Sequence, residues 1–544
     1  MIKRIHIKNF RSIKDLEIEA QALCALVGSN STGKTNILKA INVVLGDSYP
    51  TDRAFSKDDF YNRDTSHPIR IQIDFATPLE PVFLTARGVG RAECRCVSMI
   101  VSHTNDEGNS STAFTCIDET GREFFGNGQV RDQMSFIYIP SERALEKQLT
   151  IGKWTLLGKI LARVDAGFKS DADRTAAFED AMNAPREILE QDHEQGISYA
   201  KFKRAFIDRV VSNTKGHANG CELGLEIYDP LWYYKMIQIT TIEGERRFNV
   251  EEIGSGTQNL ILLSLFQAYA ELLKDKVILA IEEPELYLFP HAQRELYAEF
   301  VRLSRESQIF YTTHSSKFVN VSRADEIVLL RKAQGRTIKL NKGRLSDFLG
   351  QEQKAEMHLL TKFDAEVNEL FFASKIILVE GDTEKNVLKH ILVKLEGPDI
   401  RCHNFCVVNC RSKTAIPFFI NVMHFLGHAD YFVIYDSDLD PAKPEKHDIF
   451  NKQTHQILSL LDKPEENTLV LEHCFEVHCG YEIEHGDKLT SALKWVSEVA
   501  VEDISSDFRK VCDFIKTPNR AGTPAIVIDE ALLAIVTHSA AVLN

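Results

Sequence analysis

Apolar and polar residues alternate through the first ten residues of the chain, and this period of two predicts a half-buried strand. A continuous apolar run at 23–28 predicts a buried strand. Residues 35–45 then carry their apolar side chains on one helical face. Short β-like runs dominate from 68 to 140. The order of these elements predicts an α/β domain in the first part of the chain.

The pattern changes at about 141–220, where polar and charged residues follow the 3.6-residue period that is typical of helices. Strand patterns return at 223–250, and residues 257–273 predict a strongly apolar helix. We interpret the middle segment as a helical insertion between two halves of one α/β domain. In the second half, two buried strands and the helix between them are expected at 277–281, 308–313 and 290–305.

A polar link at 333–365 leads to a last unit in which strand-like and helical runs alternate. This alternation predicts a parallel sheet with flanking helices. Its expected strands are 375–380, 405–408 and 431–435. We therefore divide the chain into the two halves of the first domain, the insertion between them and a C-terminal domain, at 1–145, 223–365, 146–222 and 366–544.

The composition is that of an ordinary soluble globular protein, with 44% hydrophobic and 26% charged residues among 544. No apolar run reaches the roughly 18–20 residues that span a bilayer, so we expect no membrane partner. Eleven cysteines without a secretory signal predict a reduced, cytoplasmic protein. The net charge of −14 argues against a broad surface that coats nucleic acid, but local basic clusters leave DNA open as a substrate.

A glycine-rich loop follows the buried strand at 23–28. Its residues GSNSTGKT fit the pattern G-x-x-x-x-G-K-[ST] between a predicted strand and a predicted helix. Backbone N–H groups of such a loop surround a phosphate, the lysine reaches the terminal phosphates, and the Thr hydroxyl can bind Mg²⁺. We therefore expect ATP and Mg²⁺ to bind through Asn30, Gly33, Lys34, Thr35 and Asn36.

Two further strand ends carry polar residues that suit the same nucleotide. Glu282 and Glu283 end the buried strand VILAI, where a carboxylate pair can hold the Mg²⁺ shell and orient the attacking water. His314 ends the strand QIFYTT, where it could contact a γ-phosphate. A solvated strand end and a structural histidine are the alternatives.

A second set of carboxylates lies in the last unit. Glu380 ends one apolar run and Asp436 ends another, with Asp438 two residues later. Glu384 falls in the first turn of the next predicted helix. Four acids this close would repel one another strongly unless metal neutralised them, and hard oxygen ligands favour Mg²⁺ or Mn²⁺. Two such ions can promote phosphoryl displacement, so these residues alone leave nuclease, topoisomerase and primase chemistry open.

The first domain resembles the ATPase heads of the ABC group that includes RecF and SMC-like proteins. The resemblance is carried by GSNSTGKT, EEIGSGTQ at 251–258, ILAIEEPELYL and YTTHSSKF. It implies that Glu283 is the catalytic glutamate, and Glu282 stands where most of the group have Asp. It also implies that a signature loop closes on the nucleotide of a second subunit through Ser255, Gly256 and Gln258.

The last unit resembles the Toprim fold, through LVEGDTE and the later DSD. ELFFASKIILVEGDTE, after an ABC-type head, is similar to the OLD (overcoming lysogenization defect) nuclease family in particular. That resemblance implies catalytic metals on Glu380, Glu384, Asp436 and Asp438. It also implies a further acid, for which Glu482 and Glu484 both stay open, and a lysine that stabilises the transition state, for which Lys516 is preferred over Lys510.

The resemblance predicts an ATP-regulated, metal-dependent DNA endonuclease, with ATP and Mg²⁺ or Mn²⁺ as cofactors. It implies self-association through the ATPase heads and the helical insertion. It also implies a place in anti-phage defence, as in Gabija-like and retron-associated systems, with a partner protein or nucleoprotein complex. One alternative is a DNA repair or clamp protein of the RecF/SMC type whose Toprim domain is inert. Another is a strand-passing enzyme or primase.

Overall fold

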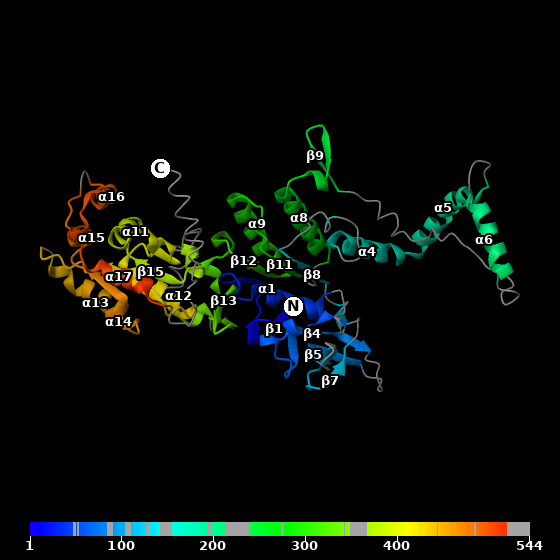
Figure 1. The fold of residues 1–544 in the computed structure, drawn as a ribbon, viewed down its shortest axis with the longest axis horizontal. Coiled ribbons are helices and arrows are strands. Elements are labelled where there is room, and N and C mark those ends of the chain that lie inside the picture. The colour runs from blue at the N-terminus through cyan, green and yellow to red at the C-terminus, as the bar shows by residue number, and fades with distance from the viewer. Residues whose placement is uncertain are drawn as a thin grey trace. The chain divides into compact units, whose positions relative to one another are not determined.

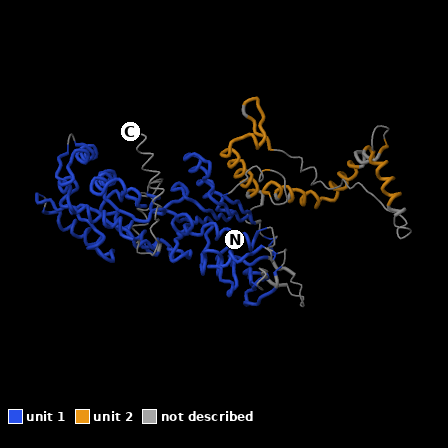
Figure 2. Tube along the Cα trace, in the orientation of Figure 1, with its two compact units in different colours: residues 1–141, 274–544 blue, residues 142–273 orange. Residues whose placement is uncertain are grey.

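We describe the protein from a computed structural model. The described residues form two compact units, residues 1–141 with 274–544 and residues 142–273 (Figure 2). None of the helices in these segments is long and apolar enough to cross a membrane. The structure describes residues 1–46, 51, 54–83, 91–103, 110–126, 130–131, 133, 135–141, 149, 155–192, 198–213, 239–273, 277–341, 343–348, 367–442, 444–483 and 486–518.

The centre of the N-terminal domain is a six-stranded sheet in the order β14-β13-β3-β12-β11-β8, in which only β14 runs antiparallel to its neighbour (Figure 1). The central strands are wholly apolar and buried, as expected for a sheet covered on both faces. Its strands are β3 (Leu23–Val27), β8 (Ser135–Ile139), β11 (Val277–Glu282), β12 (Gln308–Thr313), β13 (Ile327–Ala333) and β14 (Arg336–Lys339).

A second, antiparallel sheet has the order β2-β1-β4-β5-β6-β7. Helix α1 (Lys34–Leu45) contacts strands of both sheets, and its apolar face lies in the core that they share. The predicted α/β class is therefore confirmed. The strands of the second sheet are β1 (Ile2–Phe10), β2 (Ile13–Glu19), β4 (Ile69–Phe83), β5 (Arg91–His103), β6 (Ser110–Ile117) and β7 (Glu123–Phe125).

The C-terminal domain has a four-stranded parallel sheet in the order β16-β15-β17-β18, as the alternating pattern predicts. All four strands end at the same edge, because parallel strands share one direction. The strands are β15 (Lys375–Val379), β16 (Phe405–Asn409), β17 (Tyr431–Asp436) and β18 (Thr468–Leu471). The helices are α11 (Asp382–Glu396), α12 (Ile416–Phe425), α13 (His447–Ser459), α14 (Pro464–Asn467), α15 (Phe475–Cys479), α16 (Lys488–Glu498) and α17 (Phe508–Lys516).

The unit of residues 142–273 is mainly helical, which agrees with the helical pattern expected from about 141 onward. It extends beyond the predicted insertion to include a hairpin and one more helix. The strands predicted at 223–238 lie outside the described residues. The elements of this unit are α4 (Leu156–Lys169), α5 (Ala172–Glu190), α6 (Tyr199–Asn213), β9 (Thr240–Glu243), β10 (Arg246–Asn249) and α8 (Ser255–Leu273).

Candidate nucleotide pocket and candidate metal centre

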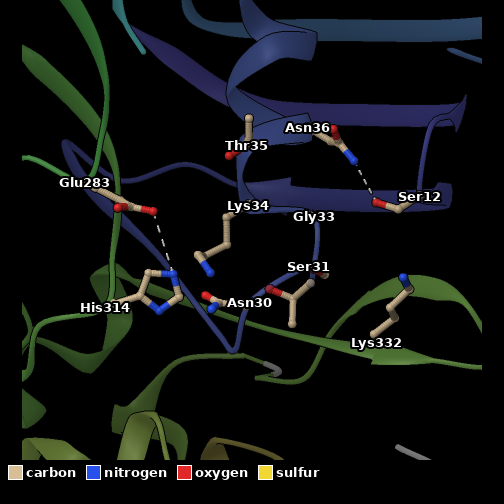
Figure 3. A pocket seen from close by; sticks show the side chains of 11 residues that line it. Ser12, Asn30, Ser31, Gly33, Lys34, Thr35, Asn36, Glu283, His314 and Lys332 are labelled. Carbon is tan, nitrogen blue, oxygen red and sulfur yellow. Dashed lines mark hydrogen bonds and ion pairs between the residues drawn. The ribbon is translucent and has the colours of Figure 1, made fainter. Parts of the chain in front are cut away.

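The glycine loop between β3 and α1 borders a cavity of about 410 Å³ (Figure 3). Every residue predicted from the loop lines this cavity, together with Glu283 and His314 from two other strand ends. Gly33 has a φ of +98°, and a Cβ there would collide with the Thr337 hydroxyl, so the loop needs glycine. Ser12 and Lys332 also line the cavity, and sequence reasoning missed both.

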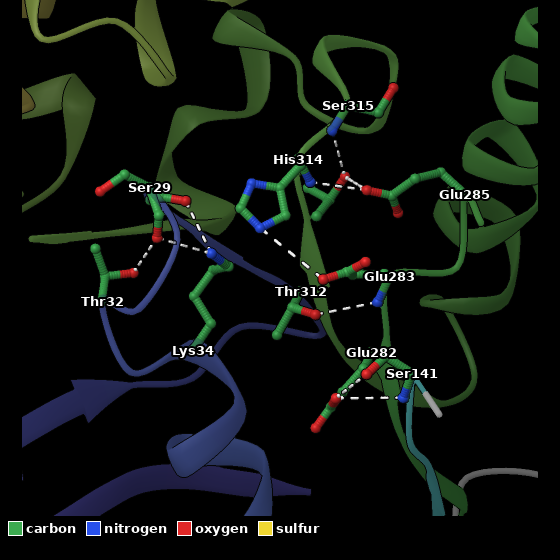
Figure 4. Close-up of polar contacts among 12 residues, drawn as sticks. Ser29, Thr32, Lys34, Ser141, Glu282, Glu283, Glu285, Thr312, His314 and Ser315 are labelled. Atoms are coloured by element: carbon green, nitrogen blue, oxygen red, sulfur yellow. Dashed lines mark hydrogen bonds and ion pairs between the residues drawn. The ribbon is translucent and has the colours of Figure 1, made fainter. Parts of the chain in front are cut away.

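The Lys34 ammonium is folded back onto the loop. Its Nζ donates to the carbonyl oxygens of Gly28 and Ser29 at 2.9 and 3.0 Å (Figure 4). Burial lowers the pKa of Lys34 to about 8, and the negative charges of Glu283 and Glu285 oppose that shift. A phosphate in the cavity would restore a full counter-charge to this ammonium, as expected of a nucleotide-binding lysine.

The two adjacent glutamates of β11 have different surroundings. Glu282 is buried and accepts hydrogen bonds from the Tyr138 hydroxyl at 2.6 Å and the Ser141 hydroxyl at 2.9 Å. Glu283 faces the cavity, with its Oε1 3.9 Å from His314 Nε2. Its own N–H donates to the Thr312 carbonyl at 3.1 Å, which fixes the backbone there. Glu283 is thus the carboxylate that could meet a nucleotide or water (Figure 4).

A third acid, Glu285, fixes the end of β12 and was not predicted. Its Oε1 accepts hydrogen bonds from the Thr313 hydroxyl and the His314 N–H, both at 2.7 Å. Burial raises the pKa of Glu285. Burial and the charge of Lys34 lower the pKa of His314, so its imidazole is neutral at neutral pH. The signal for Glu285 was present in the quoted segment EEPE, but the chemistry of Glu282 and Glu283 took precedence.

The predicted signature residues lie in the other compact unit, at the start of α8. Ser255 is exposed and begins the helix. Gln258 is buried, and its Nε2 donates to the Val250 carbonyl at 2.6 Å. The role of these residues and of Gly256 at a second subunit's nucleotide stays a prediction.

The predicted acids of the C-terminal domain meet at one edge of its sheet. Glu380 directly follows β15, and its Oε2 accepts a hydrogen bond from the N–H of Asp436 at 3.3 Å. Glu384, in the first turn of α11, is only 7% exposed. A Cβ on Gly381 would lie 2.9 Å from its carboxylate, so glycine leaves room for it. Asp438 follows in a left-handed conformation with φ +57°.

Burial and mutual repulsion perturb these acids strongly. Burial, Asp438 and Glu384 raise the pKa of Glu380 to about 7. Burial, Glu384 and Glu380 raise the pKa of Asp436 to about 8. The buried Oδ1 of Asp436 has no hydrogen-bond partner among the described residues. A divalent cation would neutralise such oxygens, so the donor set fits Mg²⁺ or Mn²⁺. Within the same described segments, no three His, Cys, Asp or Glu side chains are already arranged around one metal position.

Sequence reasoning missed two buried residues beside these acids. Glu476 on α15 is 6% exposed, pairs with Lys488 at 3.0 Å and contributes to the raised pKa of Asp436. Lys413 follows β16, the third strand that ends at this edge, and contacts Asp438. The sequence search followed two strand ends and left the third unexamined.

The remaining predicted residues of this domain lie elsewhere or are undescribed. Glu482 is exposed, and Glu484 lies outside the described residues. Lys516 pairs with Glu396 at the end of α11, roughly 18 Å along that helix from Glu384 at 1.5 Å per residue. Lys510 Nζ lies 3.9 Å from Asp507. The catalytic roles of these four residues stay predictions.

The fold and the two sites define a class of protein: a phosphate-loop ATPase domain followed by a parallel-sheet domain with carboxylates at its strand ends. A family model described as "AAA ATPase domain" matches residues 1–129 and 126–319. A second, "Overcoming lysogenization defect protein-like, TOPRIM domain", matches residues 371–438. The chain belongs to the OLD family of nucleases, with an AAA ATPase domain and an OLD-like Toprim domain.

Three relatives are similar over most of their length. The chain is 28% identical to an OLD nuclease of Thermus scotoductus, over 81% of this chain and 83% of the relative. It is 24% identical to the Old nuclease of Escherichia phage P2, over 78% and 75%. It is 23% identical to endonuclease GajA of Bacillus cereus, over 81% and 76%.

Among solved structures, an SMC head bound to the C-winged helix domain of ScpA aligns with a TM-score of 0.37 and 16% identity. That alignment covers 62% of this chain and 96% of the SMC head. The SMC head domain of Thermotoga maritima aligns with a TM-score of 0.30 and 15% identity, over 63% and 99%.

Proposed function

We propose that this protein is an ATP-regulated DNA endonuclease that depends on a divalent metal and acts in anti-phage defence. The observation that carries the proposal is the set of buried, mutually repelling acids at the ends of β15 and β17, with an unpartnered Asp436 Oδ1. The relatives named OLD nuclease and endonuclease GajA support cleavage of a nucleic acid.

The acids of this edge suit a phosphodiester-cleaving centre. Glu380, Asp436 and Asp438, with Glu384 beside them, would hold Mg²⁺ or Mn²⁺. A cation bound there supplies a Lewis acid that activates water and stabilises charge on the phosphate. Glu380 and Asp436 must lose their protons before they can act as ligands, because their pKa values are raised to about 7 and 8. Metal loading and cleavage should therefore both favour alkaline conditions.

Regulation by ATP is supported by the β13–β14 hairpin, which contacts the nucleotide loop. A Cβ on Gly28 would collide with the Leu330 carbonyl, so the loop lies directly against β13. Lys332, on the same strand, lines the nucleotide cavity (Figure 3). From β14, the Thr337 hydroxyl lies 2.8 Å from that of Ser12, another cavity residue.

The same hairpin and the segment after it contact the Toprim domain. Arg331 Nη2 lies 2.9 Å from Nδ1 of His428, which is buried after α12. Burial and the charge of Arg331 lower the pKa of His428 to about 3, so the imidazole is a neutral acceptor. A Cβ on Gly427 would lie 2.7 Å from the Leu340 carbonyl. Because Arg331 and Lys332 are neighbours on one strand, a shift of β13 caused by nucleotide would reach the Toprim domain directly.

A plasmid assay tests the proposed activity. The wild type should nick or cut supercoiled plasmid with Mn²⁺ or Mg²⁺, and Asp436→Asn should lose at least about 100-fold of that rate, because it removes a metal ligand without changing size. Glu306→Gln, on an exposed turn, is the matched control. Equal nicking by Asp436→Asn and wild type would contradict the nuclease site and favour an ATP-driven clamp.

The proposal includes self-association through the ATPase heads and the helical unit, and a partner protein or nucleoprotein of a defence system. Phe202 and Phe206 on α6 support the helical contact: they are 52% and 40% exposed, and their rings stack with centroids 6.0 Å apart. Light scattering after size-exclusion chromatography should give a mass above 61.6 kDa. Phe202→Glu should lower that mass, and an unchanged mass would exclude this contact.

A further inference from the structure

Lys413 is a buried lysine inside the Toprim domain, directly beneath the segment that carries Asp436 and Asp438. It begins the short helical turn Lys413–Ala415 after β16, and it is 4% exposed. Its Nζ donates to the carbonyl oxygens of Asp436 at 2.6 Å and Ser437 at 3.2 Å. It also donates to Asp438 Oδ2 at 3.1 Å. All three acceptors belong to one stretch of three residues.

These three contacts use the full donor capacity of an ammonium group, which has three N–H bonds. A buried ammonium is costly unless it is paired and hydrogen-bonded, so the contacts are what make its burial tolerable. Two aromatic rings complete its surroundings, with centroids 5.4 Å (Tyr435) and 5.6 Å (Phe450) from Nζ. No donor is left over to reach a substrate. Lys413 therefore acts on the segment that it holds.

The held segment has a conformation that needs support. Asp438 has a φ of +57°, in the left-handed region that costs a residue with a side chain about 1 kcal/mol. Its N–H donates to the His473 carbonyl at 2.9 Å, and the Ser437 hydroxyl accepts from the N–H of His473 at 2.8 Å. These bonds tie one side of the segment to the residues after β18, and Lys413 ties the other side to β16.

We propose that Lys413 is a positioning residue of the metal centre. Its ammonium fixes the backbone of residues 436–438, so that the carboxylates of Asp436 and Asp438 stay at the sheet edge in the arrangement that a divalent cation requires. It also supplies the one positive charge in direct contact with these two residues among the described contacts. This inference rests on the proposed metal-dependent function and adds a residue that neither the sequence motif nor the carboxylates reveal.

Direct metal binding by the full-length protein, without DNA, tests the proposal. Titration calorimetry with MnCl₂ should show that Lys413→Met weakens Mn²⁺ affinity by about 10–100-fold, the usual effect of losing a residue that orients metal ligands. Lys389→Met, on the exposed face of α11, should bind like wild type and is the matched control. Asp436→Asn should lose Mn²⁺ affinity whether or not Lys413 matters, so it tests the metal site separately.

Plasmid nicking at increasing Mn²⁺ separates positioning from direct catalysis. Lys413→Met should need about 10–100-fold more Mn²⁺ for half-maximal rate and recover most of the wild-type kcat at saturation. Unchanged Mn²⁺ affinity would overturn the proposal, and so would unchanged affinity with a lowered kcat, which indicates a role in the transition state. Should Lys413→Met fail to fold, Lys413→Gln, which keeps an N–H donor, decides by the same two readouts.

Discussion

The nucleotide pocket and the Toprim edge both serve phosphate chemistry, yet they are built in opposite ways. In the nucleotide pocket, one contiguous loop supplies the cavity wall, and Lys34 rests on the loop's own carbonyl oxygens. At the Toprim edge, acids from separate elements are forced together, and their pKa values rise toward neutrality. The first site is prepared for an anion by its backbone, whereas the second is left with excess negative charge that a cation must balance.

The largest expected effect separates the two acids of β11. Glu283→Gln should lower the rate of ATP hydrolysis by about 10²–10³-fold and leave ATP binding within a few-fold, because Glu283 faces the cavity. Steady-state phosphate release and equilibrium ATP binding measure the two quantities. Glu282→Gln should act mainly through stability, since Glu282 is buried under Tyr138 and Ser141. Equal loss of hydrolysis with no loss of stability in both variants would contradict this division.

The contrast in charge predicts a contrast in pH dependence. Mn²⁺ affinity at the Toprim site should rise by about 10–100-fold between pH 6 and pH 8, because Glu380 and Asp436 release protons over that window when metal binds. Calorimetry in buffers of different ionisation enthalpy should reveal the released protons. A flat affinity across this range would mean that these two acids are not ligands.

A smaller effect tests the hairpin that contacts both sites. Arg331→Met should reduce the effect of ATP on plasmid cleavage by about 5–20-fold, because it removes the contact with His428. ATP hydrolysis and cleavage without nucleotide should change little. Arg336→Met, exposed on β14, is the control. If Arg331→Met responds to ATP as the wild type does, this contact does not carry the coupling.

The smallest expected effect is on stability without metal. The pKa of Asp436 is raised to about 8 in the folded state, so its contribution to stability is complete below about pH 4 and is lost as pH rises toward 8. The wild type without metal should therefore melt at a temperature that falls over that range. Asp436→Asn should melt a few degrees higher than wild type at pH 8 and no higher at pH 4. Identical melting curves at pH 8 would contradict an unneutralised acid at this position.

The comparison also explains what could be predicted from the sequence. The glycine loop is contiguous, so the motif identified its residues and the strand and helix around it. Glu380 and Asp436 follow apolar strands, and the rule that parallel strands end together was enough to pair them. Strand β14 has only four residues and no clear periodicity, so it was missed within the expected polar link.

Contacts that depend on packing could not be predicted. Lys413 and Glu476 approach the acids only because β16 and α15 bring them to the same edge, and neither has a motif of its own. Glu282 and Glu283 are adjacent in sequence, and only the position of Tyr138 distinguishes the buried acid from the exposed one. Lys516 was chosen by resemblance, and α17 brings it to Glu396.

The most direct test is to locate manganese in crystals of the full-length protein by anomalous scattering. We expect a peak at the ends of β15 and β17, with carboxylate oxygens of Glu380 and Asp436 about 2.0–2.4 Å from the ion, as hard divalent cations require. Asp436→Asn crystals should lose that peak and keep any peak beside Thr35 in the nucleotide pocket. Manganese bound only in the nucleotide pocket of the wild type would contradict a Toprim metal centre.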